Sequence, residues 1–319
     1  MRIVKGLTDI PRVRVGQASD QKGLTGCTVI LFEGGAVAGV DIRGSATGTE
    51  ELDLLNPLHI TSQLDAVVLA GGSAFGLEAA SGVRRVLESR GAGFPTPAGR
   101  VPLVASAILY DLALGDASAR PTREMGALAA ESASTDPVAE GNHGAGTGAS
   151  VGKLFGMERA MKSGIGSATV ALAGRFSGVL VAALVANNAF GDVIDPADGR
   201  IVAGARKATG GFADSAAALL RGEGRLAFGN TTLAVVATNA RLSKVEATKL
   251  AQLAQQGLVR TISPVHTTVD GDVVIAASLG TASADVNALG VAAARAVSQA
   301  ILRSVTETAS LGGLPGLKR

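Results

Sequence analysis

Apolar residues in this chain gather in short runs that alternate with segments of helical periodicity. Nearly continuous apolar runs, which are typical of strands buried on both faces, occupy residues 65–70, 178–185, 231–240 and 273–279. In residues 77–90, Leu77, Val83 and Leu87 share one helical face while the arginines lie on the other. The same criteria predict a hairpin of strands 27–32 and 37–42 joined through Glu33-Gly34-Gly35, a strand at 169–172, and helices at 127–132, 211–221, 243–256 and 284–304.

These elements alternate along the whole chain without a clear linker in the middle. This order predicts an α/β fold in a single domain covering residues 1–319. Apolar residues make up 47% of the chain and charged residues 18%, which excludes a disordered protein and indicates a large core. The 43 glycines lie mostly at the ends of apolar runs, so we expect many short elements joined by tight turns.

Charge and hydropathy exclude two classes of partner. The net charge of +2 and the aromatic content of 3% argue against a nucleic-acid partner. The longest apolar stretch, residues 179–186, is shorter than the ~20 residues that a membrane helix needs. The first residues lack the apolar segment of a signal peptide, so we expect a cytoplasmic protein. The single cysteine, Cys27, excludes a disulfide framework and is expected to pack in the core.

Several motifs resemble cofactor or metal sites, but each lacks a part that the chemistry requires. Residues 144–149 carry glycines at the wrong spacing for dinucleotide binding. Gly152-Lys153 lacks both the first glycine and the hydroxyl residue of a phosphate-binding loop. His59, His143 and His266 are too scattered for a metal motif. We therefore predict neither a cofactor nor a metal.

Ser73 stands between a predicted strand and a predicted helix, as the nucleophile of a serine hydrolase does. However, Phe75 occupies the position where glycine is expected, and no histidine forms a recognisable partner pattern. A tight turn from strand to helix is the other interpretation of this segment.

Thr231 has the position that a self-processing nucleophile requires. A Gly-rich loop, residues 222–229, leads through Asn230 directly into the apolar strand 231–240. Cleavage between Asn230 and Thr231 would place a free α-amino group, with a pKa of about 8, on the same residue as the hydroxyl. Thr231 would then be both nucleophile and base, and no histidine would be needed.

Asp270-Gly271-Asp272 precedes the predicted strand 273–279. Residues two apart on a strand project from one face, so both carboxylates could point toward one site. One could hold the hydroxyl or ammonium group of Thr231, and the other could orient the first. An ordinary Asp-Gly turn is the alternative interpretation.

Several motifs in a fixed order give the chain a resemblance to a known family. They are Gly6-Leu7-Thr8-Asp9, Gly141-Asn142, 144–153, Asn188-Ala189, Gly191-Asp192, Gly229-Asn230-Thr231-Thr232 and Asp270-Gly271-Asp272. The chain resembles the self-processing hydrolases of the DmpA-type L-aminopeptidase/D-esterase family, which includes β-aminopeptidases and the nylon-oligomer hydrolase. The resemblance implies a four-layer αββα sandwich of the N-terminal-nucleophile type and a homotetramer or larger homo-oligomer.

The resemblance also implies roles for individual residues. Thr231 would be the nucleophile in both self-cleavage and substrate hydrolysis, giving fragments 1–230 and 231–319. The implied supporting residues are Asp270 and Asp272 beside Thr231, Lys153 to stabilise charge or tune the amine, Asn188 as oxyanion donor, and Tyr110 and Gly146 on the substrate or oxyanion side. Structural alternatives are a solvated charge for Lys153, a strand end for Asn188, and a turn for the glycines.

The residues place the chain nearer to one branch of the family than to the other. Threonine as nucleophile and Asp-Gly-Asp as its partner resemble the nylon-oligomer hydrolase, whereas the aminopeptidase branch uses serine and glutamate. We therefore expect an N-terminal threonine amidohydrolase or peptidase that acts on small peptides, esters or oligoamides such as aminohexanoate oligomers. The alternatives are an uncut, non-catalytic protein that binds small molecules, and a serine hydrolase that uses Ser73.

Overall fold

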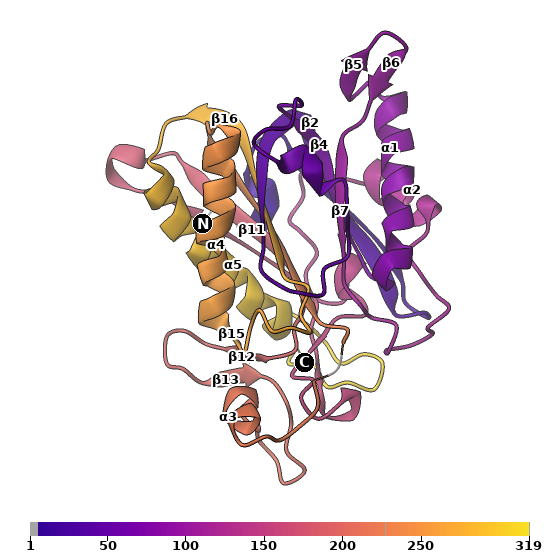
Figure 1. Cartoon of the computed structure of the whole chain (residues 1–319), viewed down its shortest axis with the longest axis vertical. Coiled ribbons are helices and arrows are strands. Elements are labelled where there is room, and N and C mark those ends of the chain that lie inside the picture. Colours follow the sequence, from indigo (N-terminus) through magenta and orange to yellow (C-terminus); the bar gives the residue numbers. More distant parts are fainter. Residues whose placement is uncertain (1–5, 227, 319) are drawn as a thin grey trace.

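The computed structural model describes residues 6–226 and 228–318, which form four layers. Two β-sheets face each other, helices α4 (Lys244–Thr261) and α5 (Val286–Thr306) cover one of them, and helices α1 (Ala79–Ser89) and α2 (Arg123–Glu131) cover the other (Figure 1). The expected single-domain αββα sandwich is confirmed.

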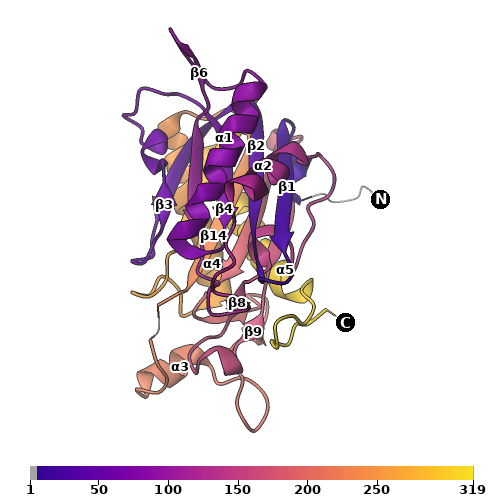
Figure 2. The ribbon, with the colours of Figure 1, turned by 90° about the vertical axis from the view of Figure 1, so that its right-hand side faces the viewer.

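The first sheet, sheet I, is built around the first half of the long strand β2 (Thr25–Ile42). Strand β2 pairs antiparallel with β1 (Val13–Asp20) on one side and with β4 (Leu64–Ala70) on the other. Strand β4 pairs parallel with β7 (Val104–Ile108), which pairs antiparallel with the short β3 (Thr49–Glu50). Helices α1 and α2 lie over the outer face of this sheet (Figure 2).

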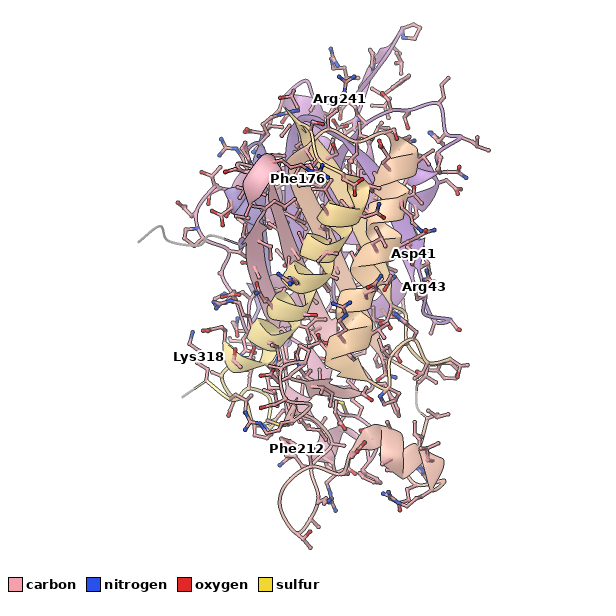
Figure 3. All side chains as sticks on the ribbon, turned by 90° about the vertical axis from the view of Figure 1, so that its left-hand side faces the viewer. Asp41, Arg43, Phe176, Phe212, Arg241 and Lys318 are labelled. Carbon is pink, nitrogen blue, oxygen red and sulfur yellow. The ribbon has the colours of Figure 1, made fainter. Side chains whose placement is uncertain are left out.

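The second sheet, sheet II, contains the second half of β2. Its other strands, in order, are β16 (Val273–Ala282), β14 (Thr231–Ala240), β11 (Leu180–Asn188) and β10 (Ile165–Ala171). Strands β14 and β16 run parallel, and every other neighbouring pair is antiparallel. Helices α4 and α5 lie side by side across the outer face of sheet II (Figure 3).

The alternation of side chains along each strand divides the core into three layers. Along β14, Ala234 and Val236 pack beneath α4 and α5, whereas Leu233 and Val235 face sheet I. Along β2, Val29 and Leu31 pack beneath α1 and α2, whereas Ile30 faces sheet II. Both faces of these strands are therefore buried, which is why their sequences read as nearly continuous apolar runs.

The helix ends follow the signals in the sequence. The Ser243 hydroxyl accepts a hydrogen bond from the Glu246 amide, and the Glu246 carboxylate accepts one from the Ser243 amide, so the predicted capping box is present. Asp285 caps α5 in a similar way through the amides of Asn287 and Ala288. Such caps typically contribute about 1 kcal/mol each.

The predicted hairpin at residues 27–42 is wrong, because these residues form the single strand β2. Gly34 and Gly35 have φ angles of 71° and 80° and bend the strand between its two halves. The first half pairs in sheet I, and residues Val37–Ile42 pair with β16 in sheet II. Glycines that could close a hairpin instead let one strand pass from one sheet to the other.

Smaller elements surround this framework. Helix α3 (Ser215–Leu220) is shorter than the predicted helix at 211–221, and it lies near a small sheet of β12 (Asp192–Ile194), β13 (Ile201–Ala203) and β15 (Ile262–Ser263). Two short hairpins complete the set, β5 (Phe94–Thr96) with β6 (Gly99–Val101) and β8 (Ser150–Val151) with β9 (Met161–Lys162). In the described part of the chain, none of the helices has the length and apolar character needed to span a membrane.

Candidate active site

The pairing of three neighbouring strands gathers the predicted site residues at one end of sheet II. Thr231 is the first residue of β14, and the antiparallel register places Asn188, the last residue of β11, directly opposite it. On the other side, Asn230 forms a parallel bridge with Asp270, just before β16 begins. Residues separated by 40 or more positions in the sequence, Asn188 from Thr231 and Asp270 from Asn230, therefore meet around the bond between Asn230 and Thr231.

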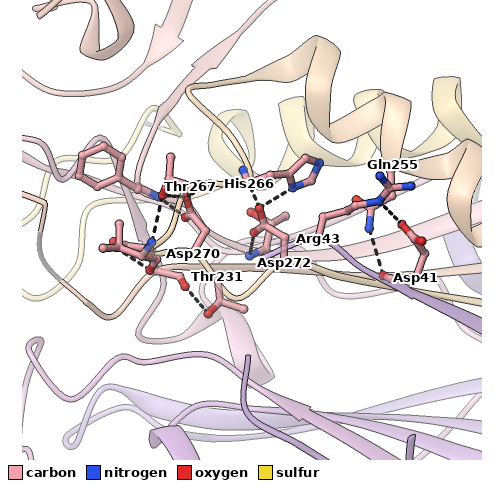
Figure 4. Close-up of polar contacts among 12 residues, drawn as sticks. Asp41, Arg43, Thr231, Gln255, His266, Thr267, Asp270 and Asp272 are labelled. Carbon is pink, nitrogen blue, oxygen red and sulfur yellow. Dashed lines mark hydrogen bonds and ion pairs between the residues drawn. The ribbon is translucent and has the colours of Figure 1, made fainter. Parts of the chain in front are cut away.

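The Thr231 hydroxyl lies beside the carbonyl group of the preceding residue. Thr231 Oγ1 donates to the Asn230 carbonyl oxygen at 2.5 Å (Figure 4). The Gly271 amide donates to the same oxygen at 2.8 Å. A Cβ atom at Gly271 would lie 2.9 Å from Thr231 Oγ1 and 2.6 Å from the Ala46 carbonyl oxygen, so glycine is needed for this approach. The backbone thus holds the Thr231 hydroxyl and the Gly271 amide on the same carbonyl oxygen.

Asp272 links the strand of Thr231 to a histidine. Its Oδ1 accepts from the Thr232 amide at 2.7 Å. Its Oδ2 lies 2.9 Å from His266 Nδ1 and accepts from the His266 amide at 3.1 Å (Figure 4). The carboxylate is almost fully buried, so these contacts replace its lost hydration and fix the backbone next to Thr231.

Asp270 fixes the opposite side of the same bond. Its Oδ1 accepts from the Phe190 amide at 3.2 Å, and its Oδ2 accepts from the Thr267 hydroxyl at 2.5 Å. Burial, and after it the nearby Asp272 carboxylate, raise the pKa of Asp270 to about 6. Within the described residues, neither carboxylate is hydrogen-bonded to the Thr231 hydroxyl.

Lys153 is buried rather than solvated. Its Nζ donates to the Asn188 Oδ1 at 2.7 Å, to the Asn188 carbonyl at 2.8 Å and to the Gly229 carbonyl at 3.2 Å. Three acceptors suit the three N–H bonds of an ammonium group. Burial nevertheless lowers the pKa of Lys153 to about 7, although Asp270 and Asp111 oppose this shift. Both protonation states are therefore accessible near neutral pH.

The Asn188 side chain has a fixed orientation. Its Oδ1 accepts from Lys153 and from the Ser150 amide, while its Nδ2 donates to the carbonyls of Tyr110 at 2.9 Å and Gly229 at 3.2 Å. In the continuous chain Asn188 Nδ2 therefore contacts the Gly229 carbonyl, which comes one residue before the Asn230 carbonyl. The donor on the Asn230 carbonyl is the Gly271 amide, and an oxyanion role for Asn188 stays a prediction.

A pocket of about 170 Å³ opens beside these groups. Tyr110, Lys153, Gly229 and Asn230 line it together with the apolar side chains of Ala113, Leu114, Met157 and Phe228. Larger hollows elsewhere share no residue with it. Gly146, which was predicted to reach the site, does not line the pocket, and its carbonyl instead accepts from Lys162 at 3.0 Å.

Comparison with known proteins identifies the family of the chain. A model of peptidase family S58 matches residues 5–319. The chain belongs to peptidase family S58. An uncharacterized aminopeptidase of Mycobacterium leprae (strain TN) is 38% identical over 98% of this S58 chain and 93% of its own length. A 6-aminohexanoate-oligomer endohydrolase of Kocuria sp. (strain KY2) is 32% identical over 93% of the chain and 84% of its own length.

Solved structures show the same architecture. A Burkholderia sp. beta-aminopeptidase has a TM-score of 0.71 and 25% identity, and the match covers 98% of this S58 chain and 91% of the other. The L-aminopeptidase D-Ala-esterase/amidase from Ochrobactrum anthropi, described as a variant of the Ntn-hydrolase fold, has a TM-score of 0.73 and 19% identity over 99% and 90% of the two chains. The S58 chain therefore has this fold and belongs to a group of amide-bond hydrolases.

Sequence reasoning did not single out two contacts of this candidate site, or one buried lysine that lies outside the lining of its pocket. Lys162 is fully buried, donates to the carbonyls of Gly146, Ala149 and Ser163, and has a pKa that burial lowers to about 7. No motif marks it, because its role depends on loop carbonyls that only the fold brings together. His266, which the sequence analysis considered as a metal ligand, contacts Asp272, and the Gly271 amide donates to the Asn230 carbonyl oxygen.

Ser73 occupies a turn, as its second interpretation predicted. It follows β4 at the start of a short 3-10 helix, Ser73–Glu78, with a φ angle of 54°, and its amide donates to the Leu109 carbonyl. Within the described residues its hydroxyl has no histidine partner. His59 instead contacts the Thr61 hydroxyl, and His266 contacts Asp272.

Proposed function

We propose that this S58 chain cuts itself between Asn230 and Thr231 and that the freed Thr231 then hydrolyses external amide bonds. The observation that carries the proposal is the shared carbonyl oxygen of Asn230, which receives the Thr231 hydroxyl at 2.5 Å and the Gly271 amide at 2.8 Å. A nucleophile beside its target carbonyl, with a donor already on the oxygen, is the arrangement that acyl transfer requires.

The self-cleavage step balances without an external reagent. Thr231 Oγ1 attacks the Asn230 carbonyl carbon, while negative charge develops on the oxygen that Gly271 holds. The Asn230–Thr231 amide bond breaks, the hydroxyl proton ends on the Thr231 nitrogen, and an ester joins the two residues. Water hydrolyses the ester, which leaves an Asn230 carboxylate and a free Thr231 amine.

Hydrolysis of a substrate repeats the same chemistry. The free amine of Thr231, with an ordinary pKa of about 8, accepts the hydroxyl proton as Thr231 attacks the substrate carbonyl. Asp272 holds the Thr232 amide and Asp270 holds the neighbouring loop, so the strand start keeps its geometry when the chain is cut. Lys153 and Asn188 supply further donors beside the acyl group. The substrates that we propose are small peptides or oligoamides, in line with the names of the relatives.

Two adjacent, matched variants test the proposal. Thr231→Val removes the hydroxyl at nearly constant volume. Thr232→Val is the control, because Thr232 Oγ1 is buried and has no hydrogen-bond partner among the described residues. Intact-mass spectrometry of freshly purified protein should give fragments 1–230 and 231–319 for the wild type and for Thr232→Val, and one uncut chain for Thr231→Val.

Each outcome separates the alternatives. A Thr231→Val protein that still splits at the same bond would show that another group is the nucleophile. A wild type that stays whole and hydrolyses no amide would favour a binding protein without catalysis. A Ser73→Ala protein that is cut normally and keeps full amidase activity would remove the serine-hydrolase alternative.

A further inference from the structure

The segment before the cleavage point occupies the acyl side of the proposed site in the continuous chain. Gly229 and Asn230 lie where the acyl part of an external substrate must lie, because Thr231 attacks the Asn230 carbonyl in the first reaction and an equivalent carbonyl in later ones. The contacts of this segment therefore describe what the acyl side can hold. This reasoning rests on the proposed function.

Two donors converge on the carbonyl that precedes the attacked one. The Gly229 carbonyl oxygen accepts from Lys153 Nζ at 3.2 Å and from Asn188 Nδ2 at 3.2 Å. Both side chains are buried, and the remaining contacts of Asn188 fix its amide so that Nδ2, a donor, faces this point. An acceptor at this position satisfies one N–H bond of each donor, in addition to the acceptors that Lys153 has on Asn188 and Asn188 has on Tyr110. A free amine there would leave these two N–H bonds without an acceptor and would place a second cation next to Lys153.

The Tyr110 ring limits the shape of the same segment. A Cβ atom at Gly229 would lie 2.6 Å from Tyr110 Cδ1 and 3.1 Å from Cγ and Cε1, and the φ angle of Gly229 is 112°, a value that L-residues rarely adopt. These ring atoms lie close to the Tyr110 backbone, whose carbonyl is held by Asn188 Nδ2. An unsubstituted carbon therefore fits against the ring, and a branched L-residue does not.

We propose that this site hydrolyses amides whose acyl part has two features. A second carbonyl precedes the attacked carbonyl by one residue, and the carbon bonded to that second carbonyl, on the side away from the attacked one, is unsubstituted. Peptides with an internal glycine have this pattern, because an α-amino acid spaces the two carbonyls as Asn230 and Gly229 do. A substrate with a free amine directly on the residue at the attacked carbonyl lacks it. The cleavage is accordingly of internal or N-acylated amides rather than removal of one N-terminal residue.

Four chromogenic substrates that copy the Gly229-Asn230 segment test this specificity on the wild-type, processed protein. Acetyl-asparagine para-nitroanilide supplies the second carbonyl, and asparagine para-nitroanilide differs only by its free amine. We expect kcat/KM to be at least about tenfold higher for the acetylated compound, because the free amine leaves one buried N–H bond of Lys153 and one of Asn188 without an acceptor. Acetyl-glycyl-asparagine para-nitroanilide should exceed its L-alanyl counterpart by about tenfold or more, because the added methyl meets the ring.

Variants of Tyr110 separate the ring contact from other effects. Tyr110→Ala should lower the ratio of glycyl to alanyl kcat/KM, and Tyr110→Phe, which keeps the ring carbons, should preserve it. Three results would overturn the inference and leave self-processing intact. The enzyme could prefer the free amine, it could cleave the glycyl and alanyl compounds equally well, or it could cleave another amide but none of these four. Absence of both cutting and amide hydrolysis in the wild type instead refutes the proposed function, so the two failures are distinct.

Discussion

Substitution of Gly271 by alanine tests the carbonyl donor at the cleavage point. The new Cβ would lie 2.6 Å from the Ala46 carbonyl oxygen and 2.9 Å from Thr231 Oγ1, well inside normal contact distances, so the loop must move. That movement draws the Gly271 amide away from the Asn230 carbonyl oxygen, now 2.8 Å distant. Loss of one such donor costs about 3 kcal/mol in the transition state, so we expect self-cleavage to slow by about a hundredfold.

The rate is measured by intact-mass spectrometry of samples taken at intervals after purification of the uncut chain. Thr232→Val serves as the matched control, because it alters the neighbouring residue without touching the Asn230 carbonyl. Thermal unfolding of the uncut proteins shows whether Gly271→Ala still folds. If a folded Gly271→Ala protein is cut at the wild-type rate, the Gly271 amide does not stabilise the transition state and the reasoning is wrong.

Further predictions concern charge, positioning, packing and assembly. In the folded protein the pKa of Lys153 is about 7, below its ordinary value of 10.5. Between these pH values the folded state binds fewer protons than the unfolded state, so the free energy of unfolding rises with pH, by at most about 1.4 kcal/mol per pH unit. Lys153→Met should reduce the slope of Tm against pH without abolishing it, because buried Lys162 contributes a slope of the same sign, and a slope equal to that of the wild type would contradict the burial argument. His266→Asn removes the ring contact to Asp272, and asparagine tolerates the φ angle of 56° at this position. Self-cleavage, measured by intact mass, should slow about tenfold. An unchanged rate would show that the contact does not affect self-cleavage. The Cys27 thiol, whose pKa burial raises to about 12, should react with a thiol reagent only after unfolding, and rapid reaction of the native protein would mean that this part of the core opens. Light scattering should find four or more copies per particle, and a monomer would refute the expected homo-oligomer.

Two strands of sheet II, β14 and β16, could be read from the sequence with the right starting residue, whereas the predictions for β10 and β11 began four residues late and two residues early. The predicted runs at 231–240 and 273–279 begin at the same residues as β14 and β16. Both strands are buried on two faces, and polar or glycine residues precede each, so the pattern has sharp limits. The hairpin at 27–42 failed because glycines that permit a turn also permit a bend. The deciding factor, pairing of Val37–Ile42 with β16, involves residues more than 230 positions away.

Part of the site follows from the strand register, whereas Lys153 lies in a loop after β8 and was predicted only through the family resemblance. Asn188 and Asp270 lie next to Thr231 and Asn230 because they end or precede paired strands, and both had been singled out in the sequence. Lys162 and His266 depend on loops. The burial of Lys162 requires three carbonyls from turns, and the His266 contact requires the chain to double back toward Asp272. Local patterns of hydrophobicity contain no information about such contacts.

The position of Thr231 at the first residue of a strand explains how a reactive carbonyl is held without special structure. In a parallel pair, the carbonyl before one strand accepts an amide from its neighbour, and the Gly271 amide fills this ordinary place for Asn230. The unusual addition is the Thr231 hydroxyl on the same oxygen, and the small Gly271 leaves room for it. Sheet pairing therefore supplies the hydrogen-bond donor that the proposed reaction needs on the carbonyl oxygen. Variants that weaken the pairing of β14 with β16 should impair folding and self-cleavage together. Thr231→Val, in contrast, should abolish cleavage and leave folding unchanged.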